Sequence, residues 1–220
     1  MNKVICIIVI NCIFCIQGQA QEKGSFSIEA NYGLQANFFV NSYNENNPFE
    51  ASFFNKNVIG SIGGLAIKYN FNKKSALIIA YDQSNNTKEI NYNENINQVD
   101  YLIKNWNIRH TNHFYQLGYE QTIPTKKSKW ILAAGIVYVR MQQQEINISE
   151  YPRGIYLRER NFKSNGLEEG GIYAGIQHSW LIDTHFELGI RTRIFYLASV
   201  NTLESITLTP VLTYHFIKMK

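Results

Sequence analysis

The stretch that decides the fold is residues 25–40, SFSIEANYGLQANFFV. From Phe26 onward every second residue is apolar or aromatic, and the residues between them are polar or glycine as far as Phe39. A period of two predicts a β-strand with one apolar and one polar face. The alternation lasts about 14 residues. An ordinary strand has about 5–6 residues, whereas a tilted strand that crosses a bilayer needs about 9–11.

The same alternation recurs seven times along the chain. The predicted strands after the first are residues 58–71, 75–87, 108–123, 130–141, 167–182, 185–196 and 205–216. Short connections follow the second, fourth and sixth strands. Longer ones follow the others, including three long polar loops at 41–57, 87–107 and 142–165. An even number of strands joined by alternately short and long connections is typical of bacterial transmembrane barrels.

Composition and charge narrow the class of protein. The chain has 220 residues, of which 17% are charged and 14% aromatic, and its mean hydropathy is −0.23. That hydropathy is too low for a helical membrane protein and fits a barrel in which half of each strand is polar. The net charge of +4 comes without a dense basic run. Nucleic-acid binding therefore has no support.

The first 20 residues predict a cleaved secretory signal peptide. Lys3 precedes an apolar run at 4–16, and Gly18-Gln19-Ala20 forms a small-x-small cleavage site. A transmembrane anchor would need about 20 apolar residues. A lipoprotein signal would need small residues before Cys15, where Ile13 and Phe14 stand instead. We therefore expect a signal peptide at 1–20, which holds all three cysteines, and a barrel domain at 21–220.

Aromatic residues indicate which face of the strands is outside. In a soluble barrel such as a lipocalin the apolar face would point inward. Here aromatic side chains of the apolar face gather at the short-turn end of seven strands, as in the girdle that membrane barrels place at the lipid headgroups. The predicted girdle consists of Phe26, Tyr69, Phe71, Tyr119, Trp130, Trp180, Phe186, Tyr214 and Phe216.

The polar face then lines the lumen and carries ionisable residues. The predicted lumen network consists of Glu29, Lys68, Asp82, Glu120, Glu187, Arg191 and Arg193. Neighbouring strands place Glu29 within reach of Lys68, and closure of the barrel places it within reach of Arg191. Side chains just fill the interior of eight strands, so we expect ion pairs that hold a narrow barrel closed. The alternative is a small gated channel.

The export signal, the eight alternating strands and a last strand ending in Tyr214-His215-Phe216 resemble small outer-membrane barrels of the OmpA transmembrane-domain and OmpX type. The resemblance covers residues 24–216. It implies an all-β, eight-stranded antiparallel up-and-down transmembrane β-barrel, monomeric, in the outer membrane of a Gram-negative bacterium. Implied partners are outer-membrane lipid, lipopolysaccharide and the barrel-assembly machinery, which recognises a terminal aromatic. Residues 217–220 follow Phe216 and depart from that pattern.

No catalytic, cofactor-binding or metal-binding residue is predicted. A lipid A deacylase of this class uses a His-x-Ser pair, whereas His178 and Ser179 are adjacent and should point to opposite faces of a strand. The leading hypothesis is a non-catalytic outer-membrane protein with a structural or surface-interaction role. The alternatives are a narrow channel or transporter for small solutes and a lipid A-modifying enzyme.

Overall fold

The computed structural model describes residues 24–38, 59–96, 99–150, 153–161 and 168–216. The predicted signal peptide and the predicted loop at 41–57 lie outside these residues. The described part consists of strands joined by turns, and it contains no helix of the length and hydropathy needed to cross a membrane. The strands are β1 Ser25–Asn37, β2 Ile59–Asn70, β3 Ser75–Ile96, β4 Val99–Pro124, β5 Lys129–Glu150, β6 Arg153–Asn161, β7 Glu168–Leu181, β8 Phe186–Leu197 and β9 Thr202–His215.

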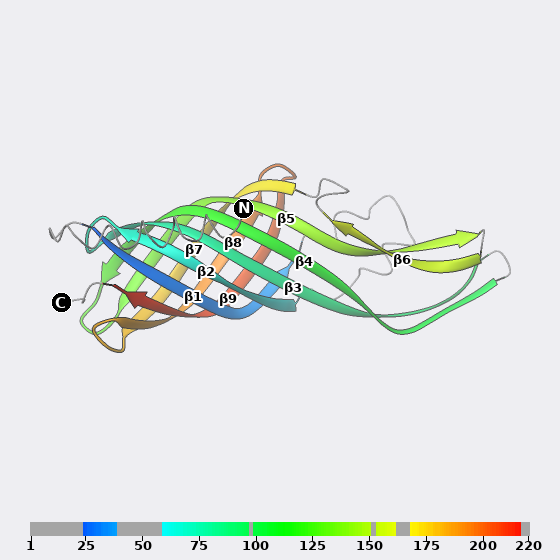
Figure 1. The fold of residues 1–220 in the computed structure, drawn as a ribbon, viewed down its shortest axis with the longest axis horizontal. Coiled ribbons are helices and arrows are strands. Elements are labelled where there is room, and N and C mark those ends of the chain that lie inside the picture. Colours follow the sequence, from blue (N-terminus) through cyan, green and yellow to red (C-terminus); the bar gives the residue numbers. More distant parts are fainter. Residues whose placement is uncertain (1–23, 39–58, 97–98, 151–152, 162–167, 217–220) are drawn as a thin grey trace, which may run out of the picture.

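Eight of these strands form a closed antiparallel barrel (Figure 1). Neighbours along the chain are neighbours in the sheet, and β1 pairs with β9 to close it. The strand β6 is the exception, because it pairs with the far half of β5 and is followed by β7, which returns to the near half of β5. The predicted fold class, an eight-stranded up-and-down barrel, is confirmed.

The two faces of the strands differ as the alternation predicts. Leu65, Ile79 and Ile136 are each at least 60% exposed on the outer surface. Their chain neighbours Ala66 and Ala80 are buried inside the barrel. An apolar exterior around an enclosed interior is the reverse of a soluble barrel and suits contact with lipid.

A row of tyrosines marks one edge of the apolar exterior. Tyr81, Tyr115 and Tyr138 are cross-strand partners on β3, β4 and β5. Their ring centroids are 5.3 and 6.2 Å apart. The next outward positions are polar. A 2.8 Å hydrogen bond joins the His113 ring nitrogen Nδ1 and the Tyr81 hydroxyl, and the Arg140 guanidinium carbon lies 5.5 Å from the centroid of the Tyr138 ring. On β3, β4 and β5 the apolar surface therefore ends at this row.

The predicted girdle lies on the outer face at the opposite end. Phe26 and Tyr69 pack with ring centroids 5.0 Å apart, and Phe186 and Tyr214 with centroids 5.2 Å apart. Aromatic contacts of this geometry stabilise neighbouring strands beyond the area they bury. Girdle residues at least 38% exposed are Phe71, Tyr119, Trp130, Trp180, Phe186 and Tyr214.

Two of the predicted long loops are instead strands. The segment 87–107 continues β3 and begins β4, which pair with each other as far as Ile96 and Val99. The segment 142–165 continues β5 to Glu150 and contains β6. Their Asn-rich and charged composition indicated loops. In the described residues these segments are instead held in pairs by backbone pairing. They form two ribbons that project from one end of the barrel (Figure 1).

Candidate functional site

The barrel interior contains the buried polar and charged side chains of the described residues. All seven ionisable residues predicted for the lumen are at most 4% exposed. Charged side chains are almost never buried to this extent unless they are paired. The arrangement of their partners therefore decides what the interior can do.

Four of the seven form one layer of ion pairs across the barrel. The Lys68 ammonium on β2 lies 2.6 Å from the Glu29 carboxylate on β1 and 2.9 Å from the Glu120 carboxylate on β4. Arg191 on β8 donates to the other oxygen of Glu29. Both pairs expected for Glu29 are thus present, and two acids balance two bases.

A second layer lies on the long-loop side of the first and centres on Asp82 of β3. Its carboxylate accepts bonds from Asn31 at 2.8 Å, Gln116 at 2.5 Å and Arg193 at 2.7 Å. Arg193 also donates to the Gln116 side-chain oxygen at 2.9 Å. Because β8 and β3 lie on different sides of the barrel, these bonds tie opposite walls together.

Glu187 lies apart from the other six. It pairs with Lys129 at 2.6 Å and with His215 at 3.1 Å, next to the short turns. The predicted strand at 130–141 left out Lys129, although this residue has the inward parity of Ile131 and Ala133 on the same strand. Extending the alternation by one step would have found this third pair.

An apolar layer fills the lumen beyond the ion pairs. Phe114 of β4 and Phe195 of β8 are fully buried, with ring centroids 4.9 Å apart. Arg193 caps this layer, because its guanidinium lies 5.4 Å from the Phe195 ring centroid. The inward parity of Val137 and Val139 was expected from the alternation, whereas the two phenylalanines were assigned to neither face. The members of the layer are Ile62, Phe114, Val137, Val139, Met141, Tyr173, Phe195 and Leu197.

A polar cluster closes the lumen at the ribbon end. The fully buried Glu204 of β9 accepts bonds from the side-chain amides of Asn37 at 3.3 Å and Asn112 at 2.5 Å. Glu204 was assigned to a loop at 199–204, and nothing in the strand periodicity signals it. His110 lies in the same part of the barrel, five residues past Tyr115 and so beyond the tyrosine row. Burial lowers the pKa of His110 to about 4, so its ring is neutral at neutral pH.

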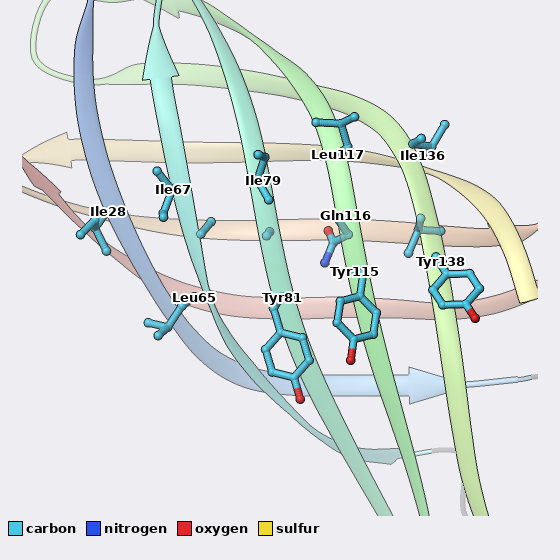
Figure 2. A pocket seen from close by; sticks show the side chains of 13 residues that line it. Ile28, Leu65, Ile67, Ile79, Tyr81, Tyr115, Gln116, Leu117, Ile136 and Tyr138 are labelled. Carbon is cyan, nitrogen blue, oxygen red and sulfur yellow. The ribbon is translucent and has the colours of Figure 1, made fainter. Parts of the chain in front are cut away.

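An apolar groove of about 580 Å³ lies on the outer surface over β2 to β5, with Ile28 of β1 at its border. Figure 2 shows Tyr81, Tyr115 and Tyr138 side by side along one edge, with aliphatic side chains such as Ile67 and Ile79 beyond them. A concave apolar surface that ends in a row of hydroxyl groups matches an acyl chain that ends in a polar head group.

Catalytic and metal sites were not expected, and the described residues bear on two of the candidates. His178 faces outward between Trp130 and Trp180, with ring centroids 4.3 and 4.4 Å away. Ser179 is buried inside the barrel and bonds to Gln177 at 2.7 Å. The two therefore lie on opposite sides of the sheet, as the alternation predicts. No group of three or more His, Cys, Asp or Glu side chains converges among the described residues.

Solved structures similar to this chain are outer-membrane β-barrels. Neisserial surface protein A is 12% identical, with a TM-score of 0.56, over 89% of this chain and 100% of its own. The chain has the fold of small eight-stranded outer-membrane barrels. Ail of Yersinia pestis, solved with a heparin analogue, is 11% identical over 88% of this chain and 99% of its own, with a TM-score of 0.48. No protein-family model matches the barrel, and no curated protein does.

A further solved structure, matched with a lower TM-score, is an enzyme. The outer-membrane protease OmpT of Escherichia coli is 8% identical over 88% of this chain and 96% of its own, with a TM-score of 0.38. Because a fold does not determine a function, the role has to be argued from the residues of this chain.

Proposed function

We propose that this barrel is an integral protein of the bacterial outer membrane whose role is to contact other proteins at the cell surface, without catalysis. The ribbon formed by β3 and β4 beyond the barrel, residues 87–96 and 99–109, carries this proposal. The pairing of β2 with β3 ends at Asn85, and that of β4 with β5 ends at His110. Past these points β3 and β4 continue with only each other as paired strands among the described residues.

Such a ribbon presents two strand edges. The backbone N–H and C=O groups along an unpaired edge are a template for another strand. Extended segments of other proteins bind in this way, because main-chain hydrogen bonds supply affinity and alternate side chains supply specificity. The ribbon also lies on the side of the long connections, which in outer-membrane barrels is extracellular. Its position thus favours contact with proteins outside the cell.

Removing the ribbon should abolish surface binding and leave the barrel intact. Asn86 and His110 are cross-strand partners, so a two-residue Asn-Gly turn replacing 87–109 should close the hairpin. We expect adhesion of cells displaying this variant to immobilised extracellular proteins to fall about tenfold or more relative to the intact chain. Migration on a gel before and after boiling should still report a folded barrel.

The second ribbon supplies a matched control. Gln144 and Glu159 are partners on β5 and β6, so the same turn replacing 145–158 shortens that ribbon alone. Adhesion should survive this change. If cells with the intact chain adhere no better than cells without it, or if loss of 87–109 leaves adhesion unchanged, the proposed role is wrong.

We further propose that the lumen does not conduct, contrary to the channel alternative. Ion pairs cross the barrel at two levels, and the apolar layer covers them. In planar bilayers the refolded protein should show no defined single-channel steps at physiological salt. Reproducible steps that disappear when the protein is left out would instead favour the narrow channel.

The outer surface suits the lipid partners expected from the sequence. We propose that an acyl chain of an outer-leaflet lipid or lipopolysaccharide occupies the groove over β2 to β5, with its head group near His113 and Arg140. The support is the apolar lining and the row of tyrosines at its edge. Aromatic rings with a polar tip favour the membrane interface.

A further inference from the structure

A β-bulge turns Glu204 into the barrel. On β8 and β9, Phe195 is opposite Ser205 whereas the next residue, Tyr196, is opposite Leu203, so Glu204 is the extra residue. In a regular strand, neighbours such as Glu204 and Ser205 would point to opposite faces. Here both are fully buried. Bulges of this kind re-aim a side chain, and they are frequent at barrel rims and beside functional sites.

The carboxyl group so placed differs from the other buried acids of the lumen. Glu29, Glu120, Asp82 and Glu187 each form an ion pair with a lysine or arginine. Within the described ranges Glu204 pairs with neither, and its donors are the two neutral amides of Asn37 and Asn112. Its second oxygen, Oε2, is buried without a hydrogen-bond partner in the described structure. A buried carboxylate in this state is costly, so the group is either protonated or balanced by a cation.

Further buried oxygen atoms without hydrogen-bond partners lie on the inner wall of the strands that flank Glu204 and Asn112. Ser205 follows Glu204 in the chain, and Asn112 contacts the Glu204 carboxyl group from β4. Thr207 and Gln35 are cross-strand partners next in line on the same inner wall, and Ser84 is the partner of Asn112. Each of these buried side chains contributes an oxygen that lacks a partner in the described structure: Gln35 Oε1, Ser84 Oγ, Asn112 Oδ1, Ser205 Oγ and Thr207 Oγ1.

We propose that Glu204 and these neutral oxygens form a binding site for a single hard metal cation at the ribbon end of the lumen. Hard cations such as Ca²⁺ take several oxygen ligands, and carboxylates, amide carbonyls and waters all serve. The site holds one buried carboxylate, with Glu169 of β7 near the same rim bonded to Ser199 at 2.5 Å. Few charged ligands imply weak binding, in roughly the millimolar range.

The geometry also assigns the cation a role. Glu204 of β9 and Asn112 of β4 lie on different walls, so their bond spans the barrel. A cation held between them would tie the mouth of the barrel next to the base of the ribbon. Such a site goes beyond the proposed surface binding and does not depend on it.

The test measures unfolding of the full barrel with defined cations. The refolded protein, in an uncharged detergent free of lipopolysaccharide, is unfolded with urea in CaCl₂, MgCl₂ or NaCl at one ionic strength set with choline chloride. A cation that binds only the folded state multiplies the folded-to-unfolded ratio by a factor of one plus the cation concentration divided by Kd. At a concentration of 20 times Kd this factor is about 20. At least one of the three salts should give this increase, with a matching Kd by calorimetry.

Substitutions locate the effect. Glu204→Gln keeps the shape and the buried amide contacts and should remove the response to the cation. Asn112→Ser removes an amide oxygen but leaves the Glu204 carboxylate in place, so it should raise the Kd severalfold. This variant tests the site if Glu204→Gln does not fold. Glu168→Gln is the control, because Glu168 faces outward in an ion pair with Arg140. No response to any of the three cations, or an equal response in the Glu204 and Glu168 variants, would overturn the proposal.

Discussion

Replacing Glu29 by glutamine is expected to lower the free energy of unfolding by about 3–5 kcal/mol, the usual cost of removing one partner from a buried ion pair. The substitution keeps the side-chain volume and removes one charge. Lys68 retains Glu120 at 2.9 Å, whereas Arg191 loses the carboxylate to which it donates. The layer of two acids and two bases then carries an excess positive charge in the barrel interior. Urea unfolding in lipid vesicles measures the difference.

Two further variants show whether the cost comes from the unpaired charge. Arg191→Met combined with Glu29→Gln restores neutrality in the layer, so the double variant should be more stable than the sum of the single effects predicts. Glu168→Gln breaks the half-exposed pair with Arg140, 3.2 Å long, and should cost about 0–1 kcal/mol. A cost for Glu29→Gln as small as that of Glu168→Gln would mean that the lumen network does not hold the barrel closed.

The barrel itself could be predicted because a membrane strand repeats one simple pattern. Each side chain of the strand at 25–40 faces either lipid or lumen, so a period of two is enforced at every step. The described part of that strand is β1, Ser25–Asn37, and the apolar positions lie outside as expected. The same enforcement explains why the pairs of Glu29 with Lys68 and Arg191 could be anticipated from strand order alone.

The ribbons could not be predicted in the same way, because nothing beyond the membrane enforces a pattern. The segment 87–107 is rich in asparagine, and this composition suggested a loop. The register of the β3–β4 ribbon continues from pairs inside the barrel, such as Asp82 with Phe114, so the barrel acts as the template. Composition rather than pairing was the misleading signal here.

The candidate site was predicted only where it obeys the alternation. Lys129 was missed by one residue at a strand end, where boundaries are least certain. Glu204 was missed because a bulge turns it inward although its place in the alternation predicts an outward side chain. A bulge depends on how two strands pair, which one strand's sequence does not show. Two members of the apolar layer, Val137 and Val139, have the inward parity that the alternation predicts, whereas Phe114 and Phe195 were assigned to neither face. Single-strand periodicity does not reveal which residues meet across the lumen.

Replacing Phe195 by alanine tests whether that apolar layer is a packed core. The ring is fully buried and contacts Phe114, Tyr173 and the Arg193 guanidinium, at centroid distances of 4.9, 5.9 and 5.4 Å. Removing it leaves a cavity enclosed by the barrel wall. We therefore expect a loss of about 3–5 kcal/mol in the free energy of unfolding, as for buried Phe in soluble cores. Phe195→Leu should cost less, because it keeps most of the volume.

An aromatic residue on the outer face gives the contrast that decides the point. Phe186 is 42% exposed and packs on Tyr214 with centroids 5.2 Å apart. Lipid chains can fill the space that Phe186→Ala leaves, so its cost should be nearer the 0.5–1.5 kcal/mol of an aromatic pair. Equal costs for Phe195→Ala and Phe186→Ala would mean that water or lipid reaches the inner position. A larger cost at Phe195 would indicate a dry, packed layer, and such a layer would support the proposal that the lumen does not conduct.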